Sequence, residues 1–352
     1  MRVLAVLLLG GLCACGVAGA GAPQPPVRFP EDGPGSFRLL TSDDLPPDRI
    51  APYLLVPERA GVGLDEPTAA PPVGARLPLW FTLREGASAV IGQTVLQGLG
   101  GDDGLRTALA ADQPWEGGAV QHPTWLVVSP ESGLPAALLL YQGQDGSVGL
   151  ASALAEPGPL QKAPGPLLAA AAVGGVASAS GVLHERGLAI YYTQQADAAE
   201  VLGVTTSYAA LRAFLGGGAG VEWRALGRVA QAQDFLVGRS SSQLTPAQRL
   251  LHVSARTAIT ATGRARHDLL LISAGAAADA PAYVHMASSY DGLAFLPLEA
   301  AIVAPTLGGR PLSASVVPMP ELPVRGDGVL SGRSLLLLSW QGARQGLLAG
   351  AR

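Results

Sequence analysis

A few charged side chains stand just before short small-residue or Pro-Thr segments, each at the predicted start of a repeated strand. Asp65 and Glu66 precede one Pro-Thr pair, His122 precedes another, and Arg256 occupies the corresponding place in a later copy. Two carboxyl groups held roughly 5–10 Å apart can cleave a glycosidic bond, one as acid and the other as base or nucleophile. Asp65 and Glu66 are therefore catalytic candidates, and His122, Trp125 and Arg256 are ligand-binding candidates.

A repeated pair of strands must position these residues. A short apolar strand is followed each time by a strand rich in small residues, and each copy extends backwards into a further strand. The clearest copies pair 138–143 with 147–152, 188–193 with 201–207, and 268–275 with 283–289, and weaker ones pair 79–82 with 89–95 and 334–342 with 345–351. Repeats of this length indicate a propeller or a solenoid. A four-stranded antiparallel unit repeated five times predicts an all-β, five-bladed β-propeller.

The ends of the repeat predict how the ring closes. Approximate blades are 60–115, 120–170, 175–230, 250–305 and 310–352, and the last copy stops at its third strand. Ser36–Thr41 resembles an outer strand, so we expect this N-terminal strand to complete the last blade and leave no open edge. The long third interval must hold an insertion, in which Tyr208–Leu215 and Pro246–Leu251 are candidate short helices. Two β-sandwiches are the structural alternative.

Composition excludes several classes of function. The 352 residues are 48% hydrophobic and only 14% charged, which is typical of a folded chain with a sizeable core. A net charge of −4 gives no electrostatic basis for binding nucleic acid. The glycine-rich segment 216–220 lacks the lysine of a phosphate-binding loop, and the five histidines show no metal-ligand spacing. We therefore expect no cofactor and no metal, and we expect His252 and His267 to be exposed.

The N-terminal segment has the pattern of an export signal. One arginine and the apolar run Val3–Leu9 lead to Leu12-Cys13-Ala14-Cys15, which resembles a bacterial lipobox with Cys15 at the acylated position. This predicts a signal peptide over 1–14, a lipidated cysteine and flexible tether over 15–34, and a single propeller domain over 35–352. The protein would then be lipid-anchored in the cell envelope, facing the periplasm or the exterior. An ordinary secretory signal with incidental cysteines is the alternative.

Several repeat phrases carry a family resemblance. Tyr141-Gln142-Gly143 with Val148–Ser152, and Ala287–Ser289 before Asp291-Gly292, resemble phrases in the five-bladed propellers of glycoside hydrolases. These are the arabinanase and xylosidase, invertase, and mannoside phosphorylase types. The resemblance covers most of the chain and implies catalytic carboxylates at the starts of the innermost strands. Only the first copy has an acid there, whereas the third has Ser178-Ala179-Ser180.

These observations favour a binding role. We expect a membrane-anchored propeller lipoprotein without a full catalytic set, which binds a carbohydrate or a protein partner at the channel face. Its first partner would be membrane lipid, through acylated Cys15. A glycoside hydrolase acting on an envelope or extracellular polysaccharide is the alternative, with Asp234 in the insertion as a source of the second carboxylate. A structural component of the envelope is a third possibility.

Overall fold

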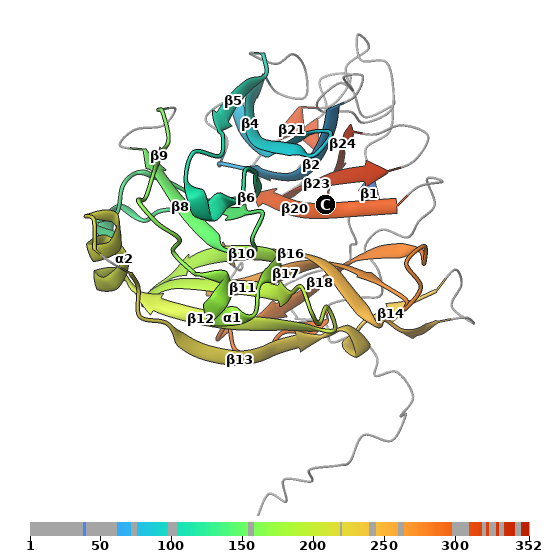
Figure 1. The fold of residues 1–352 in the computed structure, drawn as a ribbon. Coiled ribbons are helices and arrows are strands. Elements are labelled where there is room, and N and C mark those ends of the chain that lie inside the picture. The colour runs from blue at the N-terminus through green and yellow to red at the C-terminus, as the bar shows by residue number, and fades with distance from the viewer. Residues whose placement is uncertain are drawn as a thin grey trace, which may run out of the picture.

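Five four-stranded antiparallel sheets form most of the described part of the chain (Figure 1). The computed structural model describes residues 38–39, 62–71, 76–97, 104–153, 158–218, 220–238, 244–259, 264–297, 310–318, 322–323, 329–330, 334–341 and 346–351. Each sheet has its strands in sequence order from the innermost outwards, except the last, which takes its outermost strand from the N-terminal side of the chain. This arrangement confirms the predicted all-β five-bladed propeller.

The strands follow the repeat along the chain. Blade 1 contains β2 (Val62–Ala69), β3 (Arg76–Glu85), β4 (Ser88–Gln97) and β5 (Arg106–Leu109). Blade 2 contains β6 (Val120–Leu126), β7 (Ala137–Gly143), β8 (Val148–Ala153) and β9 (Gln161–Lys162). Blade 3 contains β10 (Val176–His184), β11 (Gly187–Gln194), β12 (Glu200–Ser207) and β13 (Arg224–Gln231). Blade 4 contains β16 (Arg249–Ile259), β17 (Ala265–Ala274), β18 (Ala282–Ser289) and β19 (Leu296–Pro297).

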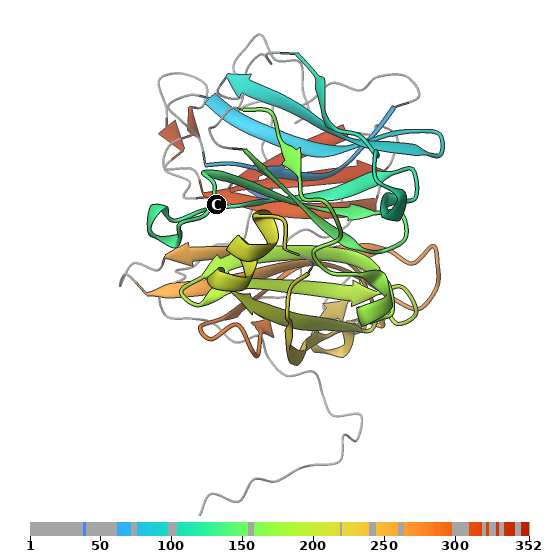
Figure 2. The ribbon, with the colours of Figure 1, turned by 60° about the vertical axis from the view of Figure 1, so that its left-hand side comes forward.

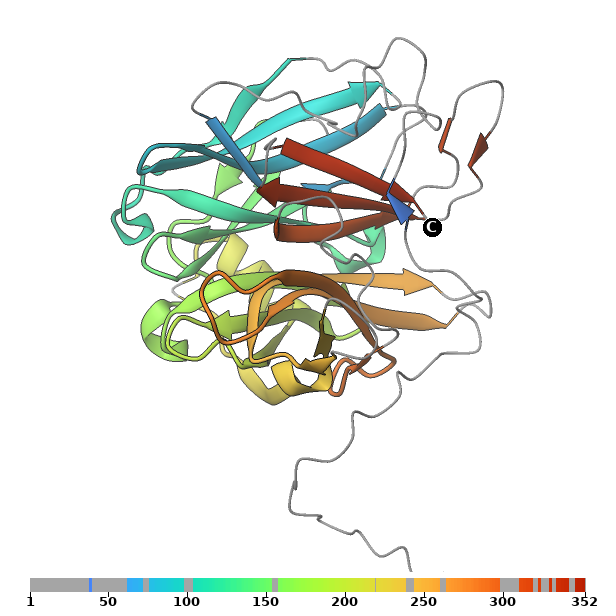
Figure 3. The same ribbon diagram turned by 90° about the vertical axis from the view of Figure 1, so that its right-hand side faces the viewer.

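Blade 5 combines three strands from the C-terminal part of the chain with β1, which precedes blade 1. It contains β20 (Arg310–Pro318), β23 (Ser334–Gln341), β24 (Gly346–Ala351) and β1 (Arg38–Leu39). β1 pairs antiparallel with β24, with Arg38 opposite Ala351 and Leu39 opposite Gly350, so these two strands lie side by side (Figure 3). The predicted closure by the segment 36–41 is therefore confirmed for its described residues, and β24 is not left as a free edge.

The core lies between neighbouring blades. Every residue of β7 is buried, which explains why the apolar strands of the repeat show no polar alternation. Trp80 of blade 1 stacks on Trp125 of blade 2, with ring centroids 4.3 Å apart. Each large apolar side chain buried in this way contributes about 1.5–3 kcal/mol to folding. The ring is thus held by packing between blades.

Short elements connect and cover the blades. Two-stranded hairpins pair β14 (Leu236–Val237) with β15 (Thr245–Pro246) and β21 (Leu322–Pro323) with β22 (Val329–Leu330). The helices are α1 (Ala170–Val173) and α2 (Tyr208–Leu215), with single turns at Pro114–Glu116, Pro130–Ser132 and Ala232–Asp234. α2 lies on the outside of the ring (Figure 2). No helix in the described ranges is both long and apolar enough to span a membrane.

Of the two short helices predicted in the insertion, one is confirmed and the other is wrong. Tyr208–Leu215 is the predicted helix, and the Ser207 side chain caps it by accepting a hydrogen bond from the Ala210 N–H. The helix predicted over Pro246–Leu251 is wrong. Thr245–Pro246 forms β15 instead, and β16 begins at Arg249, because pairing with β14 and β17 outweighs the local capping signal.

The expectation that His252 and His267 are exposed is also wrong, since 7% and 8% of their surfaces are accessible. Each has a hydroxyl partner that allows burial: Ser178 for His252 and Thr257 for His267. The predicted signal peptide and tether, including Cys15, lie outside the described residues.

Candidate functional site

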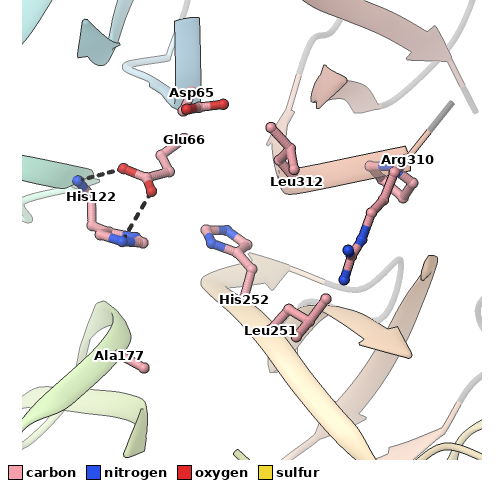
Figure 4. A pocket seen from close by; sticks show the side chains of 9 residues that line it. Asp65, Glu66, His122, Ala177, Leu251, His252, Arg310 and Leu312 are labelled. Carbon is pink, nitrogen blue, oxygen red and sulfur yellow. Dashed lines mark hydrogen bonds and ion pairs between the residues drawn. The ribbon is translucent and has the colours of Figure 1, made fainter. Parts of the chain in front are cut away.

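Each of the five innermost strands carries a bulge on the side of one channel mouth. A bulge inserts an extra residue into a strand and redirects its side chain, and bulges are common beside active sites. One residue from each of the five bulges lines the pocket at this mouth: Glu66, His122, Ala177, Leu251 and Leu312. The pocket has a volume of about 370 Å³, and Asp65, His252, Arg310 and Pro311 complete its lining (Figure 4).

Two of these bulge residues have a strained backbone. Glu66 (φ 56°) and His122 (φ 53°) are the non-glycine residues with positive φ in the described ranges. Each lies before the proline of its Pro-Thr pair. A non-glycine residue in this region costs of order 1–2 kcal/mol, and such strain persists where surrounding contacts impose it, often at functional sites. The contacts of Glu66 show what imposes it here.

The Glu66 carboxylate accepts hydrogen bonds from four donors. Oε1 lies 2.9 Å from His122 Nε2 and 3.1 Å from Nη2 of Arg84. Oε2 accepts from the Thr82 hydroxyl at 2.6 Å and from the His122 backbone N–H at 2.8 Å. Burial alone would raise the pKa of this carboxyl, but His122, Arg84 and Thr82 together hold the pKa well below its ordinary value. Glu66 is therefore an ionised, fully engaged acceptor.

The neighbouring carboxyl group behaves differently. Asp65 Oδ2 lies 3.2 Å from Arg84 Nε, so the Arg84 guanidinium forms ion pairs with both Asp65 and Glu66. Burial and the adjacent Glu66 charge raise the pKa of Asp65, and Arg84 only partly opposes them. Asp65 is consequently the pocket carboxyl that more readily holds a proton.

Histidines from blades 2 and 4 meet across the pocket. The rings of His122 and His252 stack with centroids 6.0 Å apart and an interplanar angle of 19° (Figure 4). His252 Nδ1 lies 3.3 Å from the Ser178 hydroxyl of blade 3. Burial and the neighbouring His122 lower the pKa of His252 to about 4, so His252 is neutral near pH 7. The remaining wall is largely apolar, formed by Ala177, Leu251, Pro311 and Leu312.

The site also lies on the seam that closes the ring. The Glu66 backbone N–H donates to the Ser313 hydroxyl of blade 5 at 2.8 Å. Ser313 in turn contacts the Ser339 hydroxyl at 2.7 Å, and the Ser315 hydroxyl donates to the Pro67 carbonyl. The first and last blades are thus joined by hydrogen bonds at the residue that holds His122.

Not all predicted residues meet at this mouth. Asp65, Glu66 and His122 converge in the pocket, whereas Trp125 packs on Trp80 between blades 1 and 2 and does not line it. Arg256 does not reach Glu66, because it pairs with Asp268 of its own blade at 3.0 Å. The prediction placed Arg256 at the start of its strand, but β16 begins at Arg249, and His252 takes the pocket position instead.

Four polar residues of the site were not predicted: Thr82, Arg84, His252 and Arg310. Thr82 and Arg84 lie on the second strand of blade 1, and β-strand alternation relative to Asp65 could have indicated them. Asp234 does not supply a second carboxylate here, because it is exposed and accepts hydrogen bonds from Gln231. Within the described ranges, no three His, Cys, Asp or Glu side chains form a group suited to a metal ion.

No protein-family model matches the chain, and no curated protein matches its sequence. Solved structures do match. The catalytic domain of a GH62 α-L-arabinofuranosidase from Coprinopsis cinerea has a TM-score of 0.55 and 11% identity, over 90% of this chain and 96% of that one. The α-L-arabinofuranosidase PaAbf62A from Podospora anserina, in complex with cellotriose, has a TM-score of 0.54 and 9% identity, over 85% and 94% of the two chains.

An endo-arabinase from Bacteroides thetaiotaomicron has a TM-score of 0.52 and 12% identity, over 82% of this chain and 94% of that one. The fold is that of the five-bladed glycoside hydrolase propellers. At these identities the likeness shows the fold alone, so the chemistry of the pocket must be argued from its own residues.

Proposed function

We propose that this propeller binds a saccharide in the pocket at the channel mouth, and that it does so as a lipid-anchored protein of the cell envelope. The observation that carries the binding proposal is the Glu66–His122 pair, which lines a pocket of about 370 Å³ together with Asp65. That volume falls within the range of small-molecule sites, and carboxylates and imidazoles are suitable partners for sugar hydroxyls. A similar fold holds cellotriose in the Podospora enzyme.

The distribution of carboxylates supports binding as the main role. Glycosidases place two carboxyl groups on opposite sides of the scissile bond. The carboxylates in the described pocket lining are Asp65 and Glu66, which are adjacent in the chain, and Glu66 is already engaged by four donors. The corresponding part of blade 3 presents Ala177 and Ser178.

Calorimetric titration with cellotriose, xylotriose and arabinotriose tests the binding proposal. We expect at least one oligosaccharide to bind, and we expect Asp65→Asn to weaken it about tenfold, the effect of one charge-assisted hydrogen bond. Glu200→Gln is a matched control, since Glu200 pairs with Arg228 on the exposed part of blade 3. Absence of binding by all three ligands would contradict the proposal.

Hydrolysis is a second candidate, favoured by one observation. Burial and the Glu66 charge raise the pKa of Asp65, which is the property of a general acid. An assay for new reducing ends on arabinan and xylan separates the two functions. Release of sugar that is lost in Asp65→Asn would establish the hydrolase, and no release by a protein that binds the same glycan would support the binding role.

The proposed anchor depends on Cys15, which ends the Leu12–Cys15 segment that resembles a lipobox. Two or more acyl chains give durable attachment, because each buried CH₂ contributes about 0.8 kcal/mol. Expression with labelled palmitate in a bacterial host should label the wild-type chain and not Cys15→Ser. Equal labelling of both would exclude this cysteine as the anchor.

A further inference from the structure

The pocket lining includes an arginine that pairs with no carboxylate among the described residues. Arg310 is the first residue of β20 and lies on the blade 5 side of the pocket. Within the described ranges its one hydrogen bond runs from Nη1 to the Ala278 carbonyl at 2.8 Å. Asp279 follows Ala278 in the chain but is exposed and forms no ion pair with this described arginine. The Nε and Nη2 donors of Arg310 are therefore left for a ligand.

The carboxylates of the lining, in contrast, already have cationic or polar partners. Arg84 pairs with both Asp65 and Glu66, and the His122 ring lies 2.9 Å from Glu66. Figure 4 shows Asp65, Glu66 and His122 on one side of the pocket and the Arg310 guanidinium on the other. The acidic side is thus balanced by its own neighbours, whereas the positive charge of Arg310 is left for whatever enters the pocket.

The lining beside Arg310 is apolar. Leu251, Pro311 and Leu312 form it, and the guanidinium lies next to Leu251 (Figure 4). The C–H faces of a sugar ring lose contact with water when they pack on such side chains. An ion pair formed beside an apolar wall is also less screened than a pair on an open surface, so it contributes more to affinity.

The free edge of the guanidinium selects the shape of the anion. Nε–H and one N–H of Nη2 point in parallel, which is the fork that binds both oxygens of a carboxylate. A doubly charged phosphate would fit this fork as well, but it would be repelled more strongly by the Asp65 and Glu66 charges of the same pocket. A single carboxylate therefore suits the site better.

We propose that the pocket takes an acidic saccharide, with the carboxylate of a uronic acid residue bound by Arg310 and sugar hydroxyl groups facing Asp65 and His122. This deepens the proposed function and rests on it, since it names the class of saccharide. It also sets the orientation of the ligand, because the carboxylate must face blade 5 and the hydroxyl groups must face blades 1 and 2.

Trigalacturonate and its methyl ester form a matched pair of ligands for the test. The ester keeps the sugar rings and the carbonyl groups and removes the negative charges. In calorimetric titration we expect the acid to bind about tenfold more tightly, the effect of one charge-assisted hydrogen-bonded pair. Added salt should reduce this preference, because Arg310 is only partly buried and its charge is screened.

Variants of Arg310 connect the preference to this side chain. Arg310→Gln should bind acid and ester alike, with the affinity of the wild type for the ester, which shows that the pocket is intact. Arg310→Lys should keep part of the preference, since it retains the charge without the fork. Arg224→Gln is the matched control, because it removes the same charge from an exposed position at the start of β13. Its preference should equal that of the wild type.

The outcomes distinguish this inference from the proposed function. Equal binding of acid and ester by the wild type, or a preference that Arg310→Gln retains, would overturn the inference, while binding of any neutral trisaccharide leaves the proposed function standing. Should Arg310→Gln lose the ester as well, a wild-type preference that salt does not reduce would overturn it. Competition by citrate as strong as that by trigalacturonate would also overturn it, because carboxylates alone would then suffice. If neither galacturonate ligand nor any of cellotriose, xylotriose and arabinotriose binds, the proposed function fails and the inference fails with it.

Discussion

Two buried carboxylates in this propeller are alike in charge and in the direction of their pKa shifts, and they differ in backbone conformation and in position. Glu66 in blade 1 is held by His122, Arg84 and Thr82, and Asp268 in blade 4 is held by Arg256, Arg266 and Ser288. In both cases burial opposes ionisation, and neighbouring positive charges and hydrogen bonds still lower the pKa. An ion pair with a shifted pKa therefore does not by itself mark a functional site.

The backbone and the partners distinguish them. Asp268 is fully enclosed in β17, where the pairing with Arg256 and Ser288 and with their neighbours is regular, away from the bulge at Leu250–His252. Glu66 is in the left-handed region within a bulge, lines a pocket, and holds His122, whose buried Nδ1 has no hydrogen-bond partner among the described residues. Strain and an unpartnered atom at a pocket thus indicate function here, whereas the same charges in regular strands indicate structure.

Asp268→Asn should show the largest effect if that cluster is structural. Removing the charge leaves two buried guanidinium groups without their shared carboxylate, which typically costs 3–5 kcal/mol. Denaturant unfolding measures the loss, with Glu200→Gln of the exposed pair as a control that should cost less than about 1 kcal/mol. A loss below about 1 kcal/mol for Asp268→Asn would break the comparison, because the cluster would then not be needed for stability.

Acid should weaken the fold through its buried histidines. His285 is 1% exposed, packs against Phe235, and has no partner for either ring nitrogen among the described residues. Burial lowers the pKa of His285 to about 3, and burial and His122 lower that of His252 to about 4. Both rings are neutral when folded, so the unfolded chain binds more protons below about pH 6.5 and stability falls as pH falls.

Each of these histidines contributes up to about 1.4 kcal/mol per pH unit between pH 6.5 and its folded pKa. Unfolding measured from pH 7 to pH 4.5 should show this slope, and His285→Phe should remove one histidine's share of it without affecting saccharide binding. An equal slope in the wild type and in His285→Phe would show that His285 is not buried in its neutral form.

Of these variants, His122→Asn should change stability least and should lower saccharide affinity. Asparagine tolerates the left-handed backbone and can still donate to Glu66, so stability should change by less than about 1 kcal/mol. Saccharide affinity should fall all the same, because the imidazole ring that lines the pocket is gone. Calorimetry and thermal unfolding on the same preparation compare the two, and a large loss of stability with unchanged binding would assign His122 to the structural class of Asp268.

The sequence reveals the blades more readily than the site. Apolar strands such as Ala137–Gly143 repeat often enough to give the fold and even its closure by the N-terminal strand. Asp65, Glu66 and His122 were predictable because each precedes a Pro-Thr pair at a strand start. His252, and not Arg256, lines the pocket, because the start of β16 was placed too late. The bulge in this strand also shifts its register, which the apolar pattern of the sequence does not reveal.

The hydrogen bond from Glu66 to Ser313 couples the pocket to the order of protein synthesis. One side of the pocket is made early, from β2 and β6, while the serine that fixes Glu66 belongs to the last blade, whose outer strand is the early segment β1. A growing chain therefore lacks one of the contacts that hold Glu66, the partner of His122, until the final strands have joined the first. The ligand binding that we propose would therefore require a completed ring.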